Sequence, residues 1–277
     1  MQRVMTKPKK DVKKNTLNDL SGKEWIKSTK SWFVLNSSSR GEKKLHPASF
    51  PEDIVERFVL FFTKPGQWVV DPFVGSGTTL IVSKKLGRNS IGIDLYDKYV
   101  SFAKNRLLCE TENFPSKSIV VKGDSRDIVN IHRMLELPKM DFCITSPPYW
   151  DQLQKKSERH RIRHQNGYDC KYGDNVLDLG TISDYYTFLE QQQLIFEDLY
   201  EVMADRSYLV IITNNVYKNG RLWPLAFDTL KTLSHKWVPK DEAIWCQNDK
   251  KLFPFGMFHS YIGNRSHQYC LVFQKML

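Results

Sequence analysis

The segment Thr145-Ser146-Pro147-Pro148-Tyr149-Trp150 has residue types that could hold and activate an aromatic base. The apolar run Phe142–Ile144 before it predicts a buried strand. The two prolines lack backbone N–H groups and would end the strand ladder in a stiff loop. A hydroxyl and free carbonyls in that loop could accept the hydrogens of an exocyclic amine and expose its lone pair to an activated methyl group. An aromatic ring could stack on a base taken out of its helix, although a plain tight turn is the simpler interpretation.

A second candidate is the glycine-rich segment from Asp71 to Thr79, between a predicted strand and a predicted helix. Gly75 and Gly77 allow a tight turn and close approach of the backbone to a ligand, and the helix amino terminus that follows offers unpaired N–H groups. A lone G-x-G is often only a loop, but the strand–turn–helix context favours a ligand site. Leu80 replaces the third glycine of a dinucleotide fingerprint and no Walker lysine is present, so NAD and ATP are disfavoured.

Two carboxylates follow at the ends of the next predicted strands. Asp94 lies 17 residues after Gly77, close to the spacing at which an acid binds ribose hydroxyls, although it could also be a helix N-cap. Asp124 could accept a hydrogen bond from an adenine amino group, or could be an ordinary turn residue.

The elements that must position these residues alternate along the chain. Strands are predicted at 68–70, 90–93, 119–121 and 142–144, with helices at 78–86 and around 99–107 between them. After residue 183 we expect a helix over 184–203, a strand at 208–212, a helix near 223–233 and strands at 242–246 and 269–273. This rhythm predicts an α/β fold with a doubly wound, mostly parallel sheet and right-handed crossovers.

Two possible capping boxes mark helices before the first of these strands. Ser21 and Glu24 predict a short helix that carries Trp25 and has Trp32 near its end. Ser49 and Glu52 predict a second helix, with Pro51 inside its first turn.

Bulk properties narrow the class of protein. The 277 residues carry a formal net charge of +10, which favours a polyanionic partner, nucleic acid first. The five cysteines are scattered without a C-x-x-C pair, which is typical of a reduced protein without a zinc site or disulfide framework. No signal peptide and no apolar run long enough to span a bilayer is evident, so we expect a cytoplasmic, nucleoid-associated protein without membrane contact.

Taken together, the motifs resemble those of the S-adenosylmethionine (AdoMet)-dependent DNA amino-methyltransferases, which modify N4 of cytosine or N6 of adenine. The resemblance runs from about residue 45 to the end of the chain. It implies a class I AdoMet-methyltransferase (Rossmann-like) fold with seven strands, an antiparallel hairpin at its end, and AdoMet as cofactor. It implies a catalytic loop of Ser146, Pro147, Pro148 and Tyr149. The cofactor-binding residues implied are His46, Pro47, Phe50, Asp71, Pro72, Phe73, Gly75, Gly77, Thr78, Asp94 and Asp124.

The order of the motifs along the chain resembles that in the gamma group of this family. The residues within the motifs are more like those of the beta group, in which the motif order is permuted. A serine at the head of the Pro-Pro loop resembles the N4-cytosine enzymes, because N6-adenine enzymes more often have Asp or Asn there. We therefore expect N4-cytosine methylation at a specific DNA site after base flipping, with N6-adenine as the alternative. RNA, a protein glutamine, or a role as an AdoMet-binding subunit that needs a specificity partner stay open as further alternatives.

The expected organisation is a basic tail and N-terminal helix over 1–44 and a catalytic domain over 45–277, with a basic insertion at 151–183. This insertion and the stretch 247–267 are the candidates for DNA contact. Phosphate contact is the favoured interpretation, and a solvated basic loop is the alternative. The expected partners are double-stranded DNA and a cognate restriction endonuclease or specificity subunit. The DNA-contact candidates are Trp150, Lys155, Lys156, Arg159, Arg161, Arg163 and Arg265.

Overall fold

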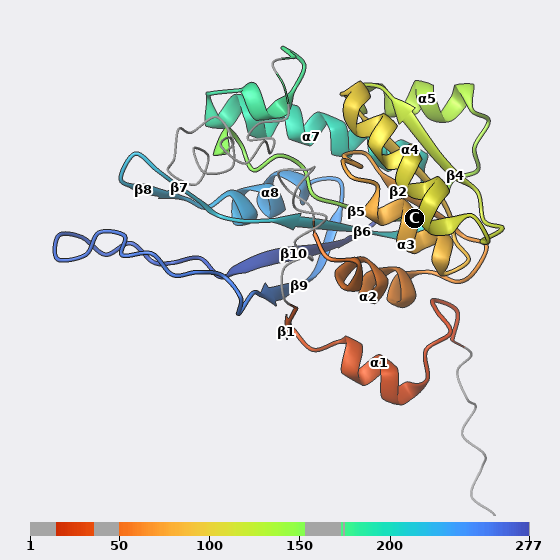
Figure 1. Ribbon diagram of the computed structural model, residues 1–277, viewed down its shortest axis with the longest axis horizontal. Helices are drawn as coiled ribbons and strands as arrows, with labels where there is room; N and C mark the ends of the chain where they lie inside the picture. Colours follow the sequence, from red (N-terminus) through yellow and green to blue (C-terminus); the bar gives the residue numbers. More distant parts are fainter. Residues whose placement is uncertain (1–14, 36–49, 153–172, 174, 277) are drawn as a thin grey trace, which may run out of the picture.

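The computed structural model describes residues 15–35, 50–152, 173 and 175–276. These residues form a central eight-stranded sheet with the strand order β1-β9-β10-β6-β5-β2-β3-β4 (Figure 1). Neighbouring strands are parallel except at β10, which runs antiparallel to both β6 and β9. The predicted doubly wound, mostly parallel α/β fold is therefore confirmed. The strands of this sheet are β1 (Trp32–Val34), β2 (Trp68–Asp71), β3 (Asn89–Asp94), β4 (Ser118–Lys122), β5 (Met140–Thr145), β6 (Met203–Thr213), β9 (Val238–Cys246) and β10 (His267–Gln274).

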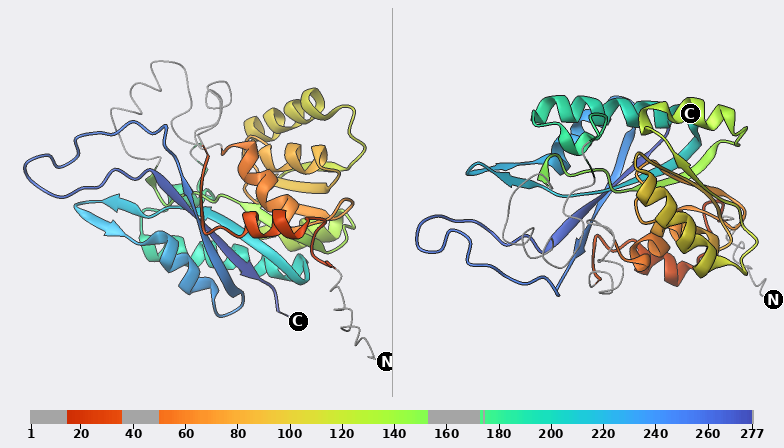
Figure 2. Two further views of the ribbon diagram at one scale, coloured as in Figure 1. Left: turned by 90° about the horizontal axis from the view of Figure 1, so that it is seen from below. Right: turned by 45° about the horizontal axis from the view of Figure 1, so that its top comes forward.

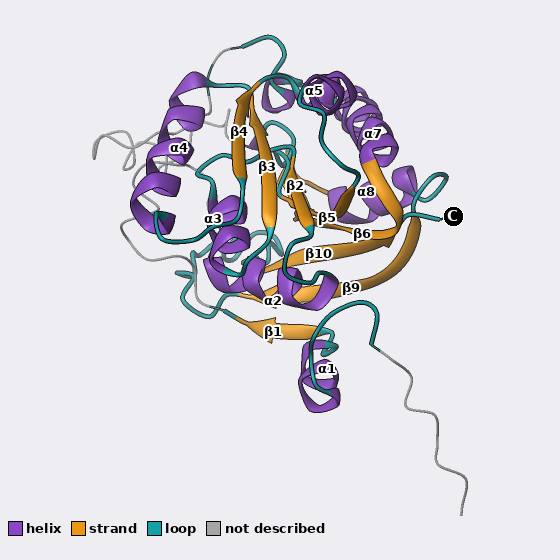
Figure 3. Cartoon of the chain, turned by 90° about the vertical axis from the view of Figure 1, so that its right-hand side faces the viewer, coloured by secondary structure: helices purple, strands orange, loops and turns teal. Residues whose placement is uncertain are grey.

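Helices cover both faces of the sheet, with α2, α3 and α4 on one face and α5, α7 and α8 on the other (Figure 3). The alternation of side chains along β5 explains the two layers. The Phe142 ring packs 5.3 Å from the Phe62 ring of α2, whereas the next residue, Cys143, joins the core on the opposite face with Phe196 of α7. The helices are α1 (Gly22–Ser28), α2 (Glu52–Phe62), α3 (Thr78–Lys85), α4 (Asp97–Thr111), α5 (Ile128–Met134), α7 (Tyr185–Val202) and α8 (Leu225–Leu233). None of the described helices is long and apolar enough to cross a membrane.

The sheet changes direction between β2 and β5. The chain runs outward from β2 through β3 to β4, and then returns to place β5 on the other side of β2. The loops that leave the carboxyl ends of β2 and β5 therefore diverge, and in sheets of this kind ligands bind in the crevice between such loops. Asp71 ends β2 and Thr145 ends β5, so both motifs from the sequence meet at this point.

The amino-terminal region differs from the expectation. The Ser21–Glu24 capping box is present, but α1 ends at Ser28, and Trp32 lies in β1 instead of in the helix. This strand adds an eighth member to the seven that were expected, because Phe33 packs into the core beside α2 and pairs with Trp245 of β9. Three residues are too few to show a strand periodicity. Pro51 is the N-cap of α2 and not part of its first turn, and Ser49 lies outside the described residues.

A short hairpin of β7 (Val216–Lys218) and β8 (Arg221–Trp223) was not predicted. Its turn is Asn219-Gly220, and both residues have positive φ angles, 53° and 73°. An Asn-Gly pair is a strong hairpin signal because a type I′ turn needs two positive φ values. The sequence therefore contained the signal, although the strands beside it are only three residues long.

Candidate active site

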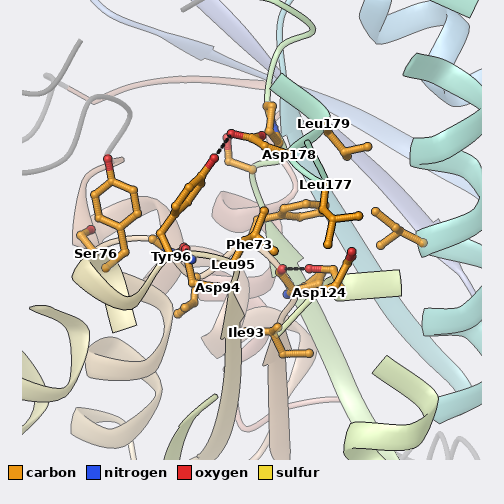
Figure 4. A pocket seen from close by; sticks show the side chains of 18 of the residues that line it. Phe73, Ser76, Ile93, Asp94, Leu95, Tyr96, Asp124, Leu177, Asp178 and Leu179 are labelled. Atoms are coloured by element: carbon orange, nitrogen blue, oxygen red, sulfur yellow. Dashed lines mark hydrogen bonds between the residues drawn. The ribbon is translucent and has the colours of Figure 1, made fainter. Parts of the chain in front are cut away.

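A pocket with about 780 Å³ of space, part of it open to solvent, lies at the switch point between β2 and β5 (Figure 4). Its walls combine the loop after β2, the end of β3, the start of η2 (Ser125–Asp127) after β4, and the loop after β5. Nine of the expected site residues line it: Phe50, Pro72, Phe73, Gly75, Thr78, Asp94, Asp124, Ser146 and Pro148. These nine residues come from five separate segments of the sequence, which converge on one cavity.

The backbone of the loop after β2 depends on glycine. Gly75 and Gly77 have φ angles of 48° and 82°, in the region that residues with a Cβ rarely adopt. Gly77 does not line the pocket, and a Cβ on it would lie 2.9 Å from Cβ of Ala103, so this glycine lets α3 approach α4. Gly92 of β3 has a matching role, since a Cβ there would lie 2.4 Å from Cγ2 of Val74 in the loop.

Asp94 is fixed in the wall of the pocket by two backbone donors. The N–H of Gly75 donates to Oδ2 at 3.0 Å and the N–H of Tyr96 donates to Oδ1 at 2.9 Å. Each carboxylate oxygen can accept a further hydrogen bond, because an ionised carboxylate has about four acceptor sites. Burial is the main cause that raises the pKa of Asp94 to about 6, so the group is ionised at neutral pH.

Asp71 was expected to hold the cofactor, but its carboxylate is fully buried and does not line the pocket. It accepts hydrogen bonds from Thr79 Oγ1 at 2.6 Å, Thr145 Oγ1 at 2.6 Å and the N–H of Phe73 at 3.0 Å. Burial raises its pKa to about 6. Asp71 is therefore a positioning residue that joins the glycine-rich loop, α3 and the end of β5.

The roof of the pocket comes from Leu177, Asp178 and Leu179, which lie in the described last part of the expected insertion 151–183 (Figure 4). The phenol of Tyr96 donates a 2.8 Å hydrogen bond to Asp178 Oδ2. Arg126 donates to the carbonyl of Leu177 at 2.6 Å. The sequence did not predict these residues, because nothing in the local pattern indicates that residues 177–179 contact the loop after β3.

Arg126 also connects the roof to the floor of the pocket. Its guanidinium forms a 2.7 Å ion pair with Asp124, which was expected near the adenine ring, and a 3.1 Å hydrogen bond with Gln191 of α7. Asp124 additionally accepts from the N–H of Arg126 and caps the short 3₁₀ helix η2. The turn interpretation and the ligand interpretation of Asp124 are thus compatible, because the residue caps a helix and lines the pocket.

The loop after β5 brings Ser146 and Pro148 into the pocket wall, whereas Pro147 is buried outside the lining. Ser146 Oγ lies 3.1 Å from the hydroxyl of Tyr149, and that hydroxyl donates to Oε1 of Gln268 at 2.7 Å. Burial raises the pKa of the Tyr149 phenol, so it stays protonated and acts as the donor. Gln268, at the start of β10, was missed, because a glutamine in a strand carries no chemical signal by itself.

Trp150 was expected to contact DNA, but its side chain is only 4% exposed. Its ring packs 5.1 Å from Tyr185 and 5.2 Å from Trp223 of β8, with the ammonium of Lys218 3.7 Å from the ring centre. Lys218 also forms an ion pair with Asp151. Trp150 and Asp151 therefore brace the β7–β8 hairpin against the loop that carries Ser146.

The remaining expected residues fall elsewhere. Arg265 is described and lies 5.6 Å from the ring of Tyr217, near the base of the β9–β10 connection. Seven others lie outside the described residues: His46, Pro47, Lys155, Lys156, Arg159, Arg161 and Arg163.

The chemistry of the pocket fits AdoMet. Three carboxylates, Asp94, Asp124 and Asp178, are among its lining residues, and the described lining contains no lysine, arginine or histidine. This charge disfavours a ligand with phosphates and favours the cationic sulfonium of AdoMet. Asp94 can accept bonds from the ribose hydroxyls. Apolar side chains such as Phe73 and Ile93 supply the surface that a nucleoside needs.

A doubly wound sheet with a pocket at its switch point is the fold of the class I AdoMet-methyltransferases. The family model described as DNA methylase matches residues 2–105. The chain is 51% identical to the Type II methyltransferase M2.DpnII of Streptococcus pneumoniae over 67 residues, which are 24% of this chain and 25% of that protein. It is 46% identical to the Type II methyltransferase M.HpaI of Haemophilus parainfluenzae over 74 residues, 27% of this chain and 24% of the relative.

The aligned segments thus span about a quarter of the length of these relatives. TrmN from Thermus thermophilus shares the fold, with a TM-score of 0.50 and 13% identity over 81% of this chain and 48% of that structure. The chain is therefore similar to DNA methylases over residues 2–105, and its fold is that of the class I AdoMet-methyltransferases.

Proposed function

We propose that this protein transfers a methyl group from AdoMet to an exocyclic amine of a DNA base, most specifically N4 of cytosine, within a particular site on double-stranded DNA. The observation that carries the proposal is the meeting of Ser146 and Pro148 with Asp94 and the glycine-rich loop in one pocket. The family match and the net charge of +10 favour DNA as the substrate.

The residues of the proposed site have distinct tasks in this reaction. When bound, AdoMet supplies an electrophilic methyl group on its sulfonium. Asp94 holds the ribose, and the buried Asp71–Thr145 bond keeps the cofactor loop and the catalytic loop in register. The Ser146 hydroxyl and the Pro147 carbonyl accept the two hydrogens of the target amine and turn its lone pair towards the methyl group. Such positioning of the amine next to the methyl group can account for most of the rate enhancement, because no covalent intermediate with the enzyme is needed.

The target base must leave the duplex to reach a pocket at the end of a sheet. Tyr149, the aromatic residue next to Pro148 in the loop after β5, would stack on it. Its hydroxyl is bound to Gln268, which fixes the ring by its edge. Neutral hydrogen-bond acceptors around Ser146 suit an amine that must lose a proton after methylation, and the proton would pass to solvent through the open side of the pocket.

The serine at position 146 carries the choice of N4-cytosine over N6-adenine. The test is incubation of the purified protein with AdoMet and unmethylated plasmid DNA, followed by mass spectrometry of the nucleosides. N4-methylcytosine is the expected product. N6-methyladenine would overturn the choice of base and keep the reaction, whereas the absence of any methylated base over varied DNA would overturn both.

A role as an AdoMet-binding subunit that needs a specificity partner is the second candidate. It is favoured by the small amount of described chain that could read a sequence, namely the β7–β8 hairpin and residues 247–266. A gel-mobility comparison of varied duplexes separates the two. A sequence preference by the protein alone supports the complete enzyme, and uniform binding supports the subunit.

A further inference from the structure

The connection between β9 and β10, residues 247–266, projects from the body as a long arm (Figures 1 and 2). The arm is closed at its base, where the N–H of Gln247 donates to the carbonyl of Ser266 at 2.7 Å. Further out, the side chain of Asn264 makes two 2.8 Å hydrogen bonds with the backbone of Phe253. The two sides of the arm are therefore tied together along part of its length.

The tip of the arm has a defined turn. The N–H groups of His259 and Ser260 both donate to the carbonyl of Gly256, at 2.9 and 2.8 Å. Gly256 has a φ of 64°, and a Cβ there would lie 2.3 Å from the carbonyl oxygen of Ser260. Phe258, beyond it, also has a positive φ of 67°, which is uncommon for a bulky residue. The turn presents this ring outward, and 91% of it is exposed.

The arm carries an unusual number of exposed apolar side chains. Large exposed apolar side chains gathered on one segment of a folded protein are typical of an interaction site. Its members are Leu252, Phe253, Phe255, Met257, Phe258 and Tyr261. The arm also has three basic residues, Lys250, Lys251 and Arg265, against one acidic residue, Asp249, so it has a net charge of +2 with histidine neutral.

The position of the arm relates it to the catalytic loop. β10 begins at the base of the arm, and its second residue, Gln268, accepts the hydrogen bond from Tyr149. Arg265 lies over Tyr217 of the β7–β8 hairpin, which is braced against the same loop. Phe258 lies ten positions before Gln268, so the tip can reach no further than about 35 Å from Gln268. That distance is about one turn of duplex DNA.

We propose that the arm is a DNA-contacting wedge: duplex DNA lies along it, and the apolar tip at Phe258 inserts between base pairs within about one helical turn of the target base. The proposal rests on the proposed function. Phe, Leu, Met and Pro are the side chains that proteins insert between base steps, where they unstack and bend the duplex. A positive charge on the arm complements the phosphates on either side of the insertion. Distortion near the target lowers the cost of taking a base out of the stack.

The test compares Phe258→Ala with the matched control Phe114→Ala, which removes a part-exposed ring after α4. Affinity is measured by fluorescence anisotropy with a labelled random-sequence duplex. Insertion is measured by relaxing plasmid with topoisomerase in the presence of protein, since an inserted side chain unwinds the duplex. Phe258→Ala should bind the duplex about five- to a hundredfold more weakly, by analogy with the loss of base–aromatic stacking. It should also lose the topoisomer shift, while Phe114→Ala keeps both.

The double change Lys250→Ala with Lys251→Ala separates charge from insertion. It should lower the slope of log affinity against log salt by about two while it retains the topoisomer shift. Equal binding and an equal topoisomer shift for Phe258→Ala and wild type would overturn the wedge. A wild-type dimer in sedimentation that Phe258→Ala dissociates, with DNA binding unchanged, would overturn it in favour of contact between copies of this chain.

The proposed function and the wedge fail in different ways. Methylated DNA from the wild type, together with unaltered behaviour of Phe258→Ala, overturns the wedge alone. A topoisomer shift that depends on Phe258, without methylated base from any DNA, supports the wedge and overturns the proposed function.

Discussion

Thr145 Oγ1 donates a 2.6 Å hydrogen bond to Asp71 Oδ1, and this bond joins the carboxyl ends of β5 and β2. The two residues are 74 positions apart, and each stands directly at the head of a functional loop. The other carboxylate oxygen holds Thr79, in the first turn of α3. Asp71 therefore ties the glycine-rich loop after β2 to the loop after β5 without lining the pocket.

Asp71 should make the stability of the protein depend on pH. Burial raises its pKa from the ordinary 3.8 to about 6, so the folded protein holds this proton more tightly than the unfolded chain does. Its contribution is fully present below pH 4 and is lost as the pH rises through about 6. In urea denaturation, the difference in free energy of unfolding between wild type and Asp71→Asn should fall by about 3 kcal/mol from pH 4 to pH 7. Parallel pH profiles would contradict this role.

Asp94 should make cofactor binding depend on pH in the opposite sense. Its pKa of about 6 means that the carboxylate loses an acceptor site as the pH falls below neutral. AdoMet affinity, measured by calorimetry, should therefore decrease from pH 7 to pH 5. Asp94→Asn should weaken binding about ten- to a hundredfold at pH 7, since hydrogen bonds to a charged acceptor contribute about 1.5–3 kcal/mol. The variant should also flatten the pH profile, and a wild-type profile without a slope in this range would argue against Asp94 as the ribose acceptor.

Ser146→Ala should separate catalysis from cofactor binding. The hydroxyl lies in the pocket wall beside Tyr149, so its loss removes one acceptor for the target amine and leaves the Asp94 side of the pocket intact. Methyl transfer should fall by about a hundredfold or more, in line with the loss of one positioned hydrogen-bonding group at a reacting centre. AdoMet affinity should stay near that of the wild type. Loss of cofactor affinity instead would mean that the loop after β5 supports the cofactor and not the substrate.

Tyr96→Phe should loosen the roof of the pocket. The change removes the 2.8 Å hydrogen bond to Asp178 and a long 3.4 Å bond from the N–H of Asn175, and it leaves the roof attached through Arg126 and Leu177. Loss of one such bond costs about 0.5–1.5 kcal/mol, so AdoMet should dissociate about two- to tenfold faster in stopped-flow measurements. Tyr186→Phe is the matched control, because its ring is 63% exposed on α7 and lies outside the pocket lining. Equal dissociation rates for the two variants would mean that the Tyr96–Asp178 bond does not retain the cofactor.

The sequence by itself determined the class of fold and much of the lining of the pocket. Strand–turn–helix spacing and the glycines at 75 and 77 are local properties, because a tight turn with positive φ needs glycine wherever the turn ends up. The alternation of strands and helices likewise fixes a parallel sheet, since parallel strands need crossovers. Asp94 and Ser146 could be expected at one pocket because Asp94 ends β3 and Ser146 follows β5, and the carboxyl ends of parallel strands share one edge.

Only the tertiary structure decided which of these residues face the pocket. Asp71 and Gly77 belong to the cofactor motif, yet one is a buried brace and the other a contact between helices, because their neighbours come from β5 and α4. The side chain of Trp150 is buried because it packs against Tyr185 of α7 and Trp223 of β8, which are distant from it in sequence. The Tyr96–Asp178 roof spans 82 residues. Such pairings depend on how loops return to the sheet, and no local pattern of residue types encodes that path.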